Sequence, residues 1–270
     1  MLDCLPVTMP AKDSNFVLIS GGASGIGRRT AERFLEQGDD VYICDVSEEH
    51  VDIFLTANPR ASGMTADIGK RGDVERIFTD ILSHRDSLDV LVNNAGIAGP
   101  SAPVDQHDED GWDDCIRVNL SGTFYMTKAA VPLLRKSVQG SIINVLSTAA
   151  LQGYPLRSAY TASKWGMMGL KKTWAMELGP EGIRVTAVCP TSVEGERIDA
   201  VIERDARQRG LPVEQVREVY LRQTSMRTFV SADDVADVVL FLASDAAKKI
   251  SGQSISVDGH TEGLSNWLDN

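Results

Sequence analysis

The chain lacks several features that would assign it to particular protein classes. It has only four cysteines and four histidines in 270 residues, and no C-x-x-C pair of the kind that binds zinc or forms a redox disulfide. Scattered single thiols favour a reducing compartment, so we expect a cytoplasmic protein with no metal site. No apolar run approaches the about 18 residues that a membrane span requires, and the N-terminal stretch lacks the basic and apolar regions of a signal peptide.

Positive charge is also scarce. Lys and Arg number 27 against 38 Asp and Glu, which gives a formal net charge of -11. Domains that bind nucleic acid carry basic patches, so this balance argues against a nucleic-acid partner. Hydrophobic residues make up 43% of the chain and charged residues 24%, as in ordinary globular proteins, and the length is sufficient for one large α/β domain.

Apolar runs of strand length alternate with amphipathic stretches of helix length. Runs such as "DVLVN" and "GSIINVL" are typical of strands buried on both faces of a parallel sheet. The expected strands are 16–20, 41–44, 62–66, 88–93, 141–146, 183–189 and 254–257. The expected helices are 28–37, 51–57, 74–83, 111–135, 159–178 and 232–243. This order predicts a doubly wound (Rossmann) α/β fold, with a parallel seven-stranded sheet covered by helices on both faces, in a single domain.

Three segments lie outside this alternation. Residues 1–14 form an N-terminal extension and residues 259–270 a C-terminal tail. Residues 191–228 form a long charged insertion with helical stretches at 198–209 and 213–221, which we expect to act as a substrate lid. Just after it, Ser231 and Asp234 resemble a capping box for the last helix.

A glycine-rich stretch, "ISGGASGIG", follows the first expected strand. Its Gly21, Gly25 and Gly27 read G-x-x-x-G-x-G, whereas the familiar dinucleotide fingerprint is G-x-G-x-x-G. A strand, a glycine turn and a helix start still make an anion site, because the backbone can approach a pyrophosphate and the first helical N–H groups point at it. A plain βα turn that contains glycines is the alternative interpretation.

Asp45 ends the second expected strand, 18 residues after Gly27. A carboxylate at about this separation can accept hydrogen bonds from the adenosine ribose and would repel a 2′-phosphate. It therefore favours NAD over NADP as the cofactor. Arg28 and Arg29, directly after the loop, keep NADP open.

The stretch "YTASK" places Tyr160 and Lys164 one helical turn apart, on one face of the expected helix. Ser147 follows the strand "SIINVL", so all three side chains should meet at the carboxyl ends of central strands, where open α/β sheets bind ligands. A tyrosine has a pKa near 10, so action as a base near neutral pH needs a shift of about 2 to 3 units. One cation about 4.5 Å away at an effective dielectric near 20 contributes roughly 3.7 kcal/mol, so Lys164 can supply much of that shift.

Five motifs follow one another along the chain: "SGGASGIG", "NNAG" at 93–96, "VNLSGTF" at 118–124, Ser147 and "YTASK". Together they resemble the short-chain dehydrogenase/reductase family in its single-domain form, over residues 16–259. The resemblance also accounts for the glycine spacing, because the family's loop reads T-G-x-x-x-G-x-G, with Ser20 here in place of the threonine.

The resemblance implies a catalytic role for four residues. Tyr160 would exchange a proton with the substrate oxygen, and Ser147 would hold and polarise that oxygen. Lys164 would support Tyr160 and bond the nicotinamide ribose, while Asn119 would anchor a water in the proton relay. The cofactor contacts that it implies are Gly21, Ser24, Gly25, Ile26, Gly27, Asp45, Asp67, Ile68, Asn93, Ala95, Gly96, Tyr160, Lys164, Pro190 and Val193.

The sequence departs from the family pattern after the sixth strand. The family reads P-G-x-V-x-T, whereas residues 190–195 read "PTSVEG", so the backbone of Val193 would still hold the carboxamide, with Thr191 or Ser192 in place of the lost hydroxyl. The candidates for a substrate pocket are Leu151, Tyr154, Arg157, Glu194 and Arg197. The two arginines suit an anionic substrate and Glu194 a cationic one, and the alternative is that these charges face water.

These features predict an NAD-dependent dehydrogenase that interconverts a small-molecule secondary alcohol and a ketone. An NADPH-dependent ketoreductase of 3-oxoacyl thioesters is the alternative, and a catalytically silent dinucleotide-binding sensor is a second one. The 159–178 helix is rich in small residues and, with 111–135, resembles the helices through which the family forms oligomers. We therefore expect a homotetramer.

Overall fold

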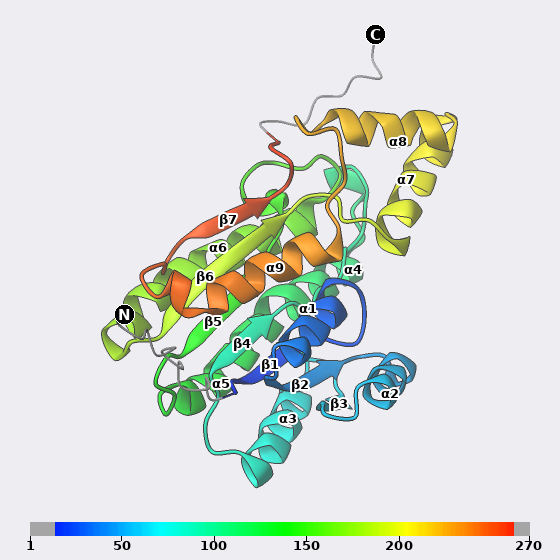
Figure 1. The fold of residues 1–270 in the computed structure, drawn as a ribbon. Helices are drawn as coiled ribbons and strands as arrows, with labels where there is room; N and C mark the ends of the chain where they lie inside the picture. The colour runs from blue at the N-terminus through cyan, green and yellow to red at the C-terminus, as the bar shows by residue number, and fades with distance from the viewer. Residues whose placement is uncertain (1–13, 262–270) are drawn as a thin grey trace, which may run out of the picture.

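The strands form one parallel sheet. The computed structural model describes residues 14–261, apart from the side chains of residues 196, 197 and 208. Its strands are β1 (Phe16–Ser20), β2 (Asp40–Asp45), β3 (Ser62–Thr65), β4 (Val90–Asn93), β5 (Ser141–Val145), β6 (Arg184–Pro190) and β7 (Ser254–Val257). All neighbours are parallel and the order is β3-β2-β1-β4-β5-β6-β7, so the predicted doubly wound seven-stranded sheet is confirmed (Figure 1).

The helices cover both faces of this sheet. One face carries α1 (Gly25–Glu36), α2 (Glu48–Ala57) and α9 (Ala232–Ala243), and Figure 1 shows α1 and α9 side by side over it. The other carries α3 (Arg71–His84), α5 (Thr123–Leu134) and α6 (Ser158–Leu178). The predicted capping box of α9 is confirmed, since the Ser231 and Asp234 side chains each bond the other's backbone N–H.

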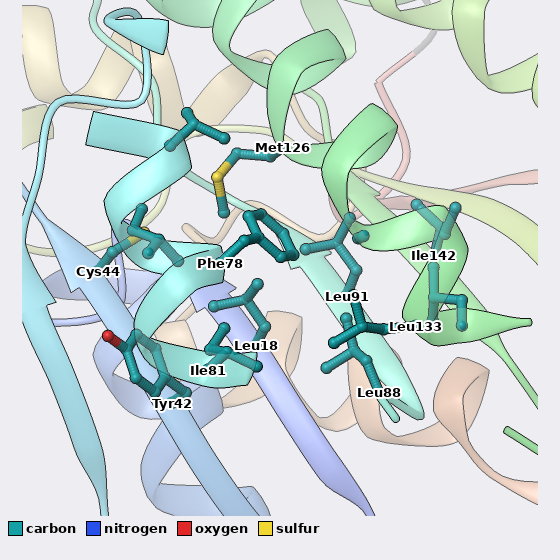
Figure 2. Close-up of a cluster of buried hydrophobic side chains, with 14 of the residues drawn as sticks. Leu18, Tyr42, Cys44, Phe78, Ile81, Leu88, Leu91, Met126, Leu133 and Ile142 are labelled. Atoms are coloured by element: carbon teal, nitrogen blue, oxygen red, sulfur yellow. The ribbon is translucent and has the colours of Figure 1, made fainter. Parts of the chain in front are cut away.

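Two apolar layers hold the helices to the sheet, because successive side chains of a strand point to opposite faces. In β1, Leu18 packs toward α3 and α5, whereas Val17 and Ile19 pack toward α1 and α9. Figure 2 shows the first layer, in which Phe78 and Met126 meet Leu18. Each buried side chain of this size contributes about 1.5–3 kcal/mol, so both layers fix the strand ends on which a site can be built.

The predicted 111–135 helix is interrupted. The chain forms α4 (Glu109–Ile116), then a π-helical turn over Arg117–Gly122, and only then α5. Within this turn the fully buried side chain of Asn119 bonds both backbone groups of Ile97, which follows β4. The turn contains a contact with a residue 22 positions away, and helical periodicity alone could not reveal such a contact.

The insertion after β6 contains two helices, as predicted. These are α7 (Glu196–Arg209) and α8 (Val213–Arg222), which lie at the upper right of Figure 1, outside the two helical layers. They pack on each other through Ile202, Ala206 and Val216, which form an apolar cluster of their own. Within residues 14–261, no helix is long and apolar enough to cross a membrane.

Candidate active site

The glycine loop joins β1 to α1 and leaves one backbone face open. Gly21 takes a φ of +63°, and a Cβ added to Gly27 would stand 2.0 Å from the carbonyl oxygen of Gly21. A Cβ added to Gly25 would meet nothing within 4 Å, and both Ser24 and Gly25 are exposed. The loop is therefore closely packed behind and open in front, where the first N–H groups of α1 begin. This arrangement fits a dinucleotide pyrophosphate.

Asn94 holds the loop from behind. Its side-chain nitrogen donates hydrogen bonds to the carbonyl oxygens of Ser20 at 3.2 Å and Gly21 at 2.9 Å. In return, the Ser20 hydroxyl accepts from the backbone N–H groups of Asn94 and Ala95. The sequence did not reveal this role of Asn94, although the residue stands in the "NNAG" motif that pointed to its three neighbours.

Asn93 faces the other way. Its side-chain nitrogen donates to the Thr127 hydroxyl and to the Asn144 side-chain oxygen, both at 3.0 Å, and the residue is 2% exposed. The alternation of side chains along β4 sends Asn93 into the interior toward α5. Any contact of Asn93 with a cofactor would therefore use its backbone.

Asp45 lies at the carboxyl end of β2, beside the glycine loop. Its carboxylate accepts from the backbone N–H of Ala23 at 3.2 Å and from that of Ser47 at 3.3 Å. The two arginines that keep NADP open in the sequence are engaged with carboxylates, since Arg28 pairs with Glu32 and Arg29 pairs with Asp233 of α9. A negative group therefore lies at the edge of the loop, and both cations have partners of their own.

Asp67 and Ile68 follow β3. The Asp67 carboxylate accepts from the Gly69 N–H and forms an ion pair with Arg117 at 2.9 Å. Burial lowers the pKa of Arg117, but Asp67 and Asp114 together outweigh it and raise this pKa. Ile68 is 4% exposed and packs against Gly122. The pair connects the loop after β3 to the π-helical turn that carries Asn119.

Two of the four predicted catalytic residues, Asn119 and Lys164, meet at Gly96, and a third, Tyr160, lies beside Lys164. A Cβ added to Gly96 would stand 3.1 Å from Asn119 Oδ1 and 3.7 Å from Lys164 Nζ. Lys164 is 3% exposed, and its ammonium donates to the carbonyl oxygen of Val145 at the end of β5. Its Nζ lies 5.6 Å from the centroid of the Tyr160 ring.

Asn119 has a full set of hydrogen bonds. Its Oδ1 accepts from the N–H of Ile97 at 2.8 Å, and its Nδ2 donates to the C=O of Ile97 and to the Ser163 hydroxyl, both at 3.0 Å. Ser163 in turn donates to the carbonyl oxygen of Tyr160 at 2.7 Å. Asn119 therefore fixes the loop after β4 to the second turn of α6, and Ser163 is a second residue that the sequence did not reveal.

Ser147 and Val193 lie at the ends of neighbouring strands. The half-buried Ser147 begins a short 3₁₀ turn, and its hydroxyl accepts from the Ala149 N–H at 3.2 Å. Val193 forms a parallel bridge with Val230, in which the C=O of Ser192 and the N–H of Glu194 make the hydrogen bonds. This geometry directs the backbone groups of Val193 itself away from Val230. Pro190, the last residue of β6, ends the strand beside them.

The candidate pocket residues have different surroundings. Burial raises the pKa of Tyr154, which interacts electrostatically with Arg157 and Tyr160. Leu151 is 44% exposed and Glu194 is exposed, while the side chain of Arg197 lies outside the described residues. Tyr154 and Arg157 are therefore the two candidates that lie beside Tyr160.

Large exposed apolar side chains follow several of the strands that end at this edge. Val46, after β2, is 72% exposed, and Ile97, after β4, is 40% exposed. These two side chains are thus exposed at the carboxyl edge of the sheet, where open α/β sheets bind ligands. No group of three or more His, Cys, Asp or Glu side chains that could hold a metal ion occurs in the part of the chain that the structure describes.

Comparison with known proteins decides the family. The sequence model of a family described as enoyl-(acyl carrier protein) reductase matches residues 21–261, which is most of the chain. A 3-oxoacyl-(acyl-carrier-protein) reductase of Thermotoga maritima is 37% identical over 246 residues, which cover 90% of this chain and 95% of the relative. The chain belongs to the short-chain dehydrogenase/reductase family. This short-chain dehydrogenase/reductase is therefore an oxidoreductase, as the motifs predicted.

Other members of the family act on different molecules. A D-beta-hydroxybutyrate dehydrogenase of Rhizobium meliloti is 32% identical to this short-chain dehydrogenase/reductase over 251 residues, covering 90% of this chain and 96% of the relative. The crystal structure of an actinorhodin polyketide ketoreductase with NADPH superposes with a TM-score of 0.88 at 30% identity, covering 96% of this chain and all of that one. The names of these proteins thus include both a dehydrogenase and reductases.

Proposed function

We propose that this protein is an NAD-dependent dehydrogenase that interconverts a secondary alcohol and a ketone. One observation carries the proposal. The "NNAG" segment holds the glycine loop through Asn94 and, two residues later, packs Gly96 against Asn119 and Lys164 beside Tyr160. The place for a dinucleotide and the place for proton transfer are therefore built on one short segment.

The chain's own residues would handle the substrate oxygen and its proton. The hydroxyl proton of the alcohol would go to the phenolate of Tyr160. A bound NAD would supply the acceptor for the hydride that leaves the alcohol carbon. Ser147 would donate a hydrogen bond to the same oxygen, and Lys164, close to the Tyr160 ring, would favour the phenolate. In the opposite direction, Tyr160 would return the proton to the reduced oxygen.

The glycine loop and the strand ends would hold the cofactor. The pyrophosphate would bind at the open face of Gly25, and the Asp45 carboxylate would accept hydrogen bonds from the ribose hydroxyls. Asp67, Ile68, Ala95 and the backbone of Val193 would complete the contacts. The ion pairs of Arg28 and Arg29 support NAD over NADP, because their charges are already compensated by carboxylates.

A ketoreductase of 3-oxoacyl thioesters that uses NADPH is the second candidate. The name of the Thermotoga relative and the NADPH bound in the similar ketoreductase structure favour it. Against it stands Asp45, because a carboxylate in this place would repel a 2′-phosphate.

The first experiment tests Tyr160. We expect Tyr160→Phe to slow alcohol oxidation by at least about 100-fold, since it removes the group that takes the proton. Tyr125→Phe, on α5, is the matched control and should keep the parent rate. A parent rate in Tyr160→Phe, measured as NADH formation with a panel of neutral, cationic and anionic secondary alcohols, would show that the mechanism is wrong.

The second experiment tests the cofactor. Asp45→Asn keeps an acceptor for the Ala23 N–H but removes the negative charge, so we expect the ratio of NADP to NAD turnover to rise about tenfold. Asp86→Asn, an exposed carboxylate in the turn before β4, is the control. An unchanged ratio in Asp45→Asn would remove the basis for NAD and favour the second candidate.

We also propose a homotetramer in the cytoplasm. Large exposed apolar side chains lie on α4, α5 and α6, namely Trp112, Phe124 and Trp165. Light scattering of Trp165→Lys against the parent tests the assembly, and we expect a smaller species. The three described cysteines are buried free thiols, which suits a reducing compartment.

A further inference from the structure

Two cations flank the ring of Tyr160. Lys164 Nζ lies 5.6 Å from the ring centroid, and Arg157 Cζ lies 5.3 Å from it. Arg157 precedes Tyr160 by three positions and Lys164 follows it by four, so the turn that begins α6 brings both to the same side chain. Only Lys164 belongs to the motif that predicted the site.

Arg157 stands where an arginine is locally unfavourable. It is the N-cap of α6, a position that prefers Ser, Thr, Asp or Asn, and its side chain makes no capping hydrogen bond. The N-terminus of a helix also carries the positive end of the helix dipole, which disfavours a cation. Helix formation therefore gives no reason for this residue.

The backbone before Arg157 adopts a rare conformation. Leu156 has a φ of +65°, a left-handed value that residues other than glycine seldom take. Its carbonyl oxygen accepts from the Ala102 N–H at 3.1 Å, and the Arg157 N–H donates to the carbonyl oxygen of Tyr154 at 3.3 Å. Strain held in place by such contacts, next to an unfavourable cap, is typical of a functional position.

We propose that Arg157 is a positioning residue for proton transfer, whose guanidinium acts with Lys164 to favour the phenolate of Tyr160. A cation close to the ring lowers the energy of the charged phenolate relative to the neutral phenol, and the guanidinium of Arg157 adds to the effect of Lys164 in this direction. The proposal rests on the proposed function, in which Tyr160 is the base.

The other ionisable groups of this region are partly compensated among themselves. From α7, Asp205 pairs with Arg209 at 2.7 Å. Burial raises the pKa of Tyr220 on α8 and of Tyr154, and in both cases Arg157 acts in the opposite direction. The positive charge of Arg157 thus acts on Tyr154 and Tyr220 in the direction that favours their ionisation.

The test is the pH dependence of oxidation of a neutral secondary alcohol by the full chain with NAD. We expect Arg157→Gln to move the acid limb of kcat/KM to higher pH by about half a unit to one unit, which is about a three- to tenfold slower rate below the limb. In Arg157→Lys the acid limb should lie close to its position in the parent, because lysine keeps the positive charge. Lys172→Gln, an exposed cation on the same helix, should leave the limb in place.

A limb that stays in place in Arg157→Gln would overturn the proposal. A loss confined to anionic alcohols, seen as a higher KM with the limb unmoved, would also overturn it and assign Arg157 to substrate binding. A second measurement needs no turnover: the ultraviolet titration of tyrosinate, taken as the difference between the parent and Tyr160→Phe, should move to higher pH in Arg157→Gln.

The two measurements separate this proposal from the function on which it rests. Full activity in Tyr160→Phe would refute the proposed function, while the absorbance titration would still report whether Arg157 favours the phenolate. An unmoved titration in Arg157→Gln, in protein with the parent melting temperature, would refute the role of Arg157 alone.

Discussion

Gly25→Ala and Gly27→Ala, two substitutions in the glycine loop, should lower the stability of the protein by unequal amounts and for different reasons. Gly25→Ala meets no neighbour but places a side chain at a φ of +52°, which costs about 1–2 kcal/mol. Gly27→Ala places its Cβ 2.0 Å from the Gly21 carbonyl oxygen and 2.4 Å from Asn94 Nδ2, so the loop and Asn94 must separate. The second change adds about 1–3 kcal/mol of overpacking to the loss of two hydrogen bonds of about 1 kcal/mol each.

The total for Gly27→Ala is therefore about 3–5 kcal/mol. At about 2–4 °C per kcal/mol, we expect a melting temperature lower by roughly 6–20 °C, against about 2–8 °C for Gly25→Ala. Since the displaced Gly21 backbone belongs to the expected cofactor site, Gly27→Ala should also weaken NADH binding by more than about tenfold.

Thermal unfolding followed by circular dichroism and titration of NADH fluorescence measure the two effects in the same preparations. Equal melting temperatures and equal affinities for the two variants would refute the reasoning, because packing behind the loop would then have no consequence. A loss of NADH affinity in Gly25→Ala greater than in Gly27→Ala would show that the open face, rather than the packed one, limits binding.

Two further predictions concern buried polar residues. Asn119→Leu leaves the N–H and C=O of Ile97 without their partner, which costs about 1–3 kcal/mol for each group. Ser163→Ala removes only one hydrogen bond of Asn119, so the melting temperature should fall further in Asn119→Leu than in Ser163→Ala. Equal losses would contradict the role of Asn119 in holding the loop after β4. Burial lowers the pKa of Lys171, so between that lowered value and the ordinary value near 10.5 the unfolded chain binds more protons than the folded one. The free energy of unfolding should therefore rise with pH in this window. Lys171→Met should abolish the rise, and a rise of unchanged size in this variant would refute its origin in Lys171.

The residues of the site differ in how far the sequence could identify them. The glycine loop and the Tyr160–Lys164 pair could be predicted, because their spacing along the chain is itself the requirement of the chemistry. The burial of Asn93 and the role of Asn94 could not, although the two are adjacent. The two side chains differ because that of Asn94 points to the glycine loop and that of Asn93 points into the interior. The motif alone does not tell which of them faces the glycine loop.

The sequence by itself determined the alternation of strands and helices, the parallel sheet and the edge of the sheet at which the candidate site residues lie. These follow from hydrophobic periodicity and from the rule that parallel strands end on one side, both of which are local or topological. Even the two helices of the insertion could be placed from their pattern.

Only the tertiary structure decided the partners of the polar groups. Asn119 bonds Ile97 across 22 positions from within the π-helical turn, Arg117 reaches Asp67 across 50 positions, and Arg29 reaches Asp233 across 204. Arg157 is near Tyr160 in the chain, but its place over the ring and the left-handed Leu156 before it appear only in the folded structure. Hydrogen bonds and ion pairs depend on distances between atoms, and folding brings those atoms together only once the sheet and its helices are packed.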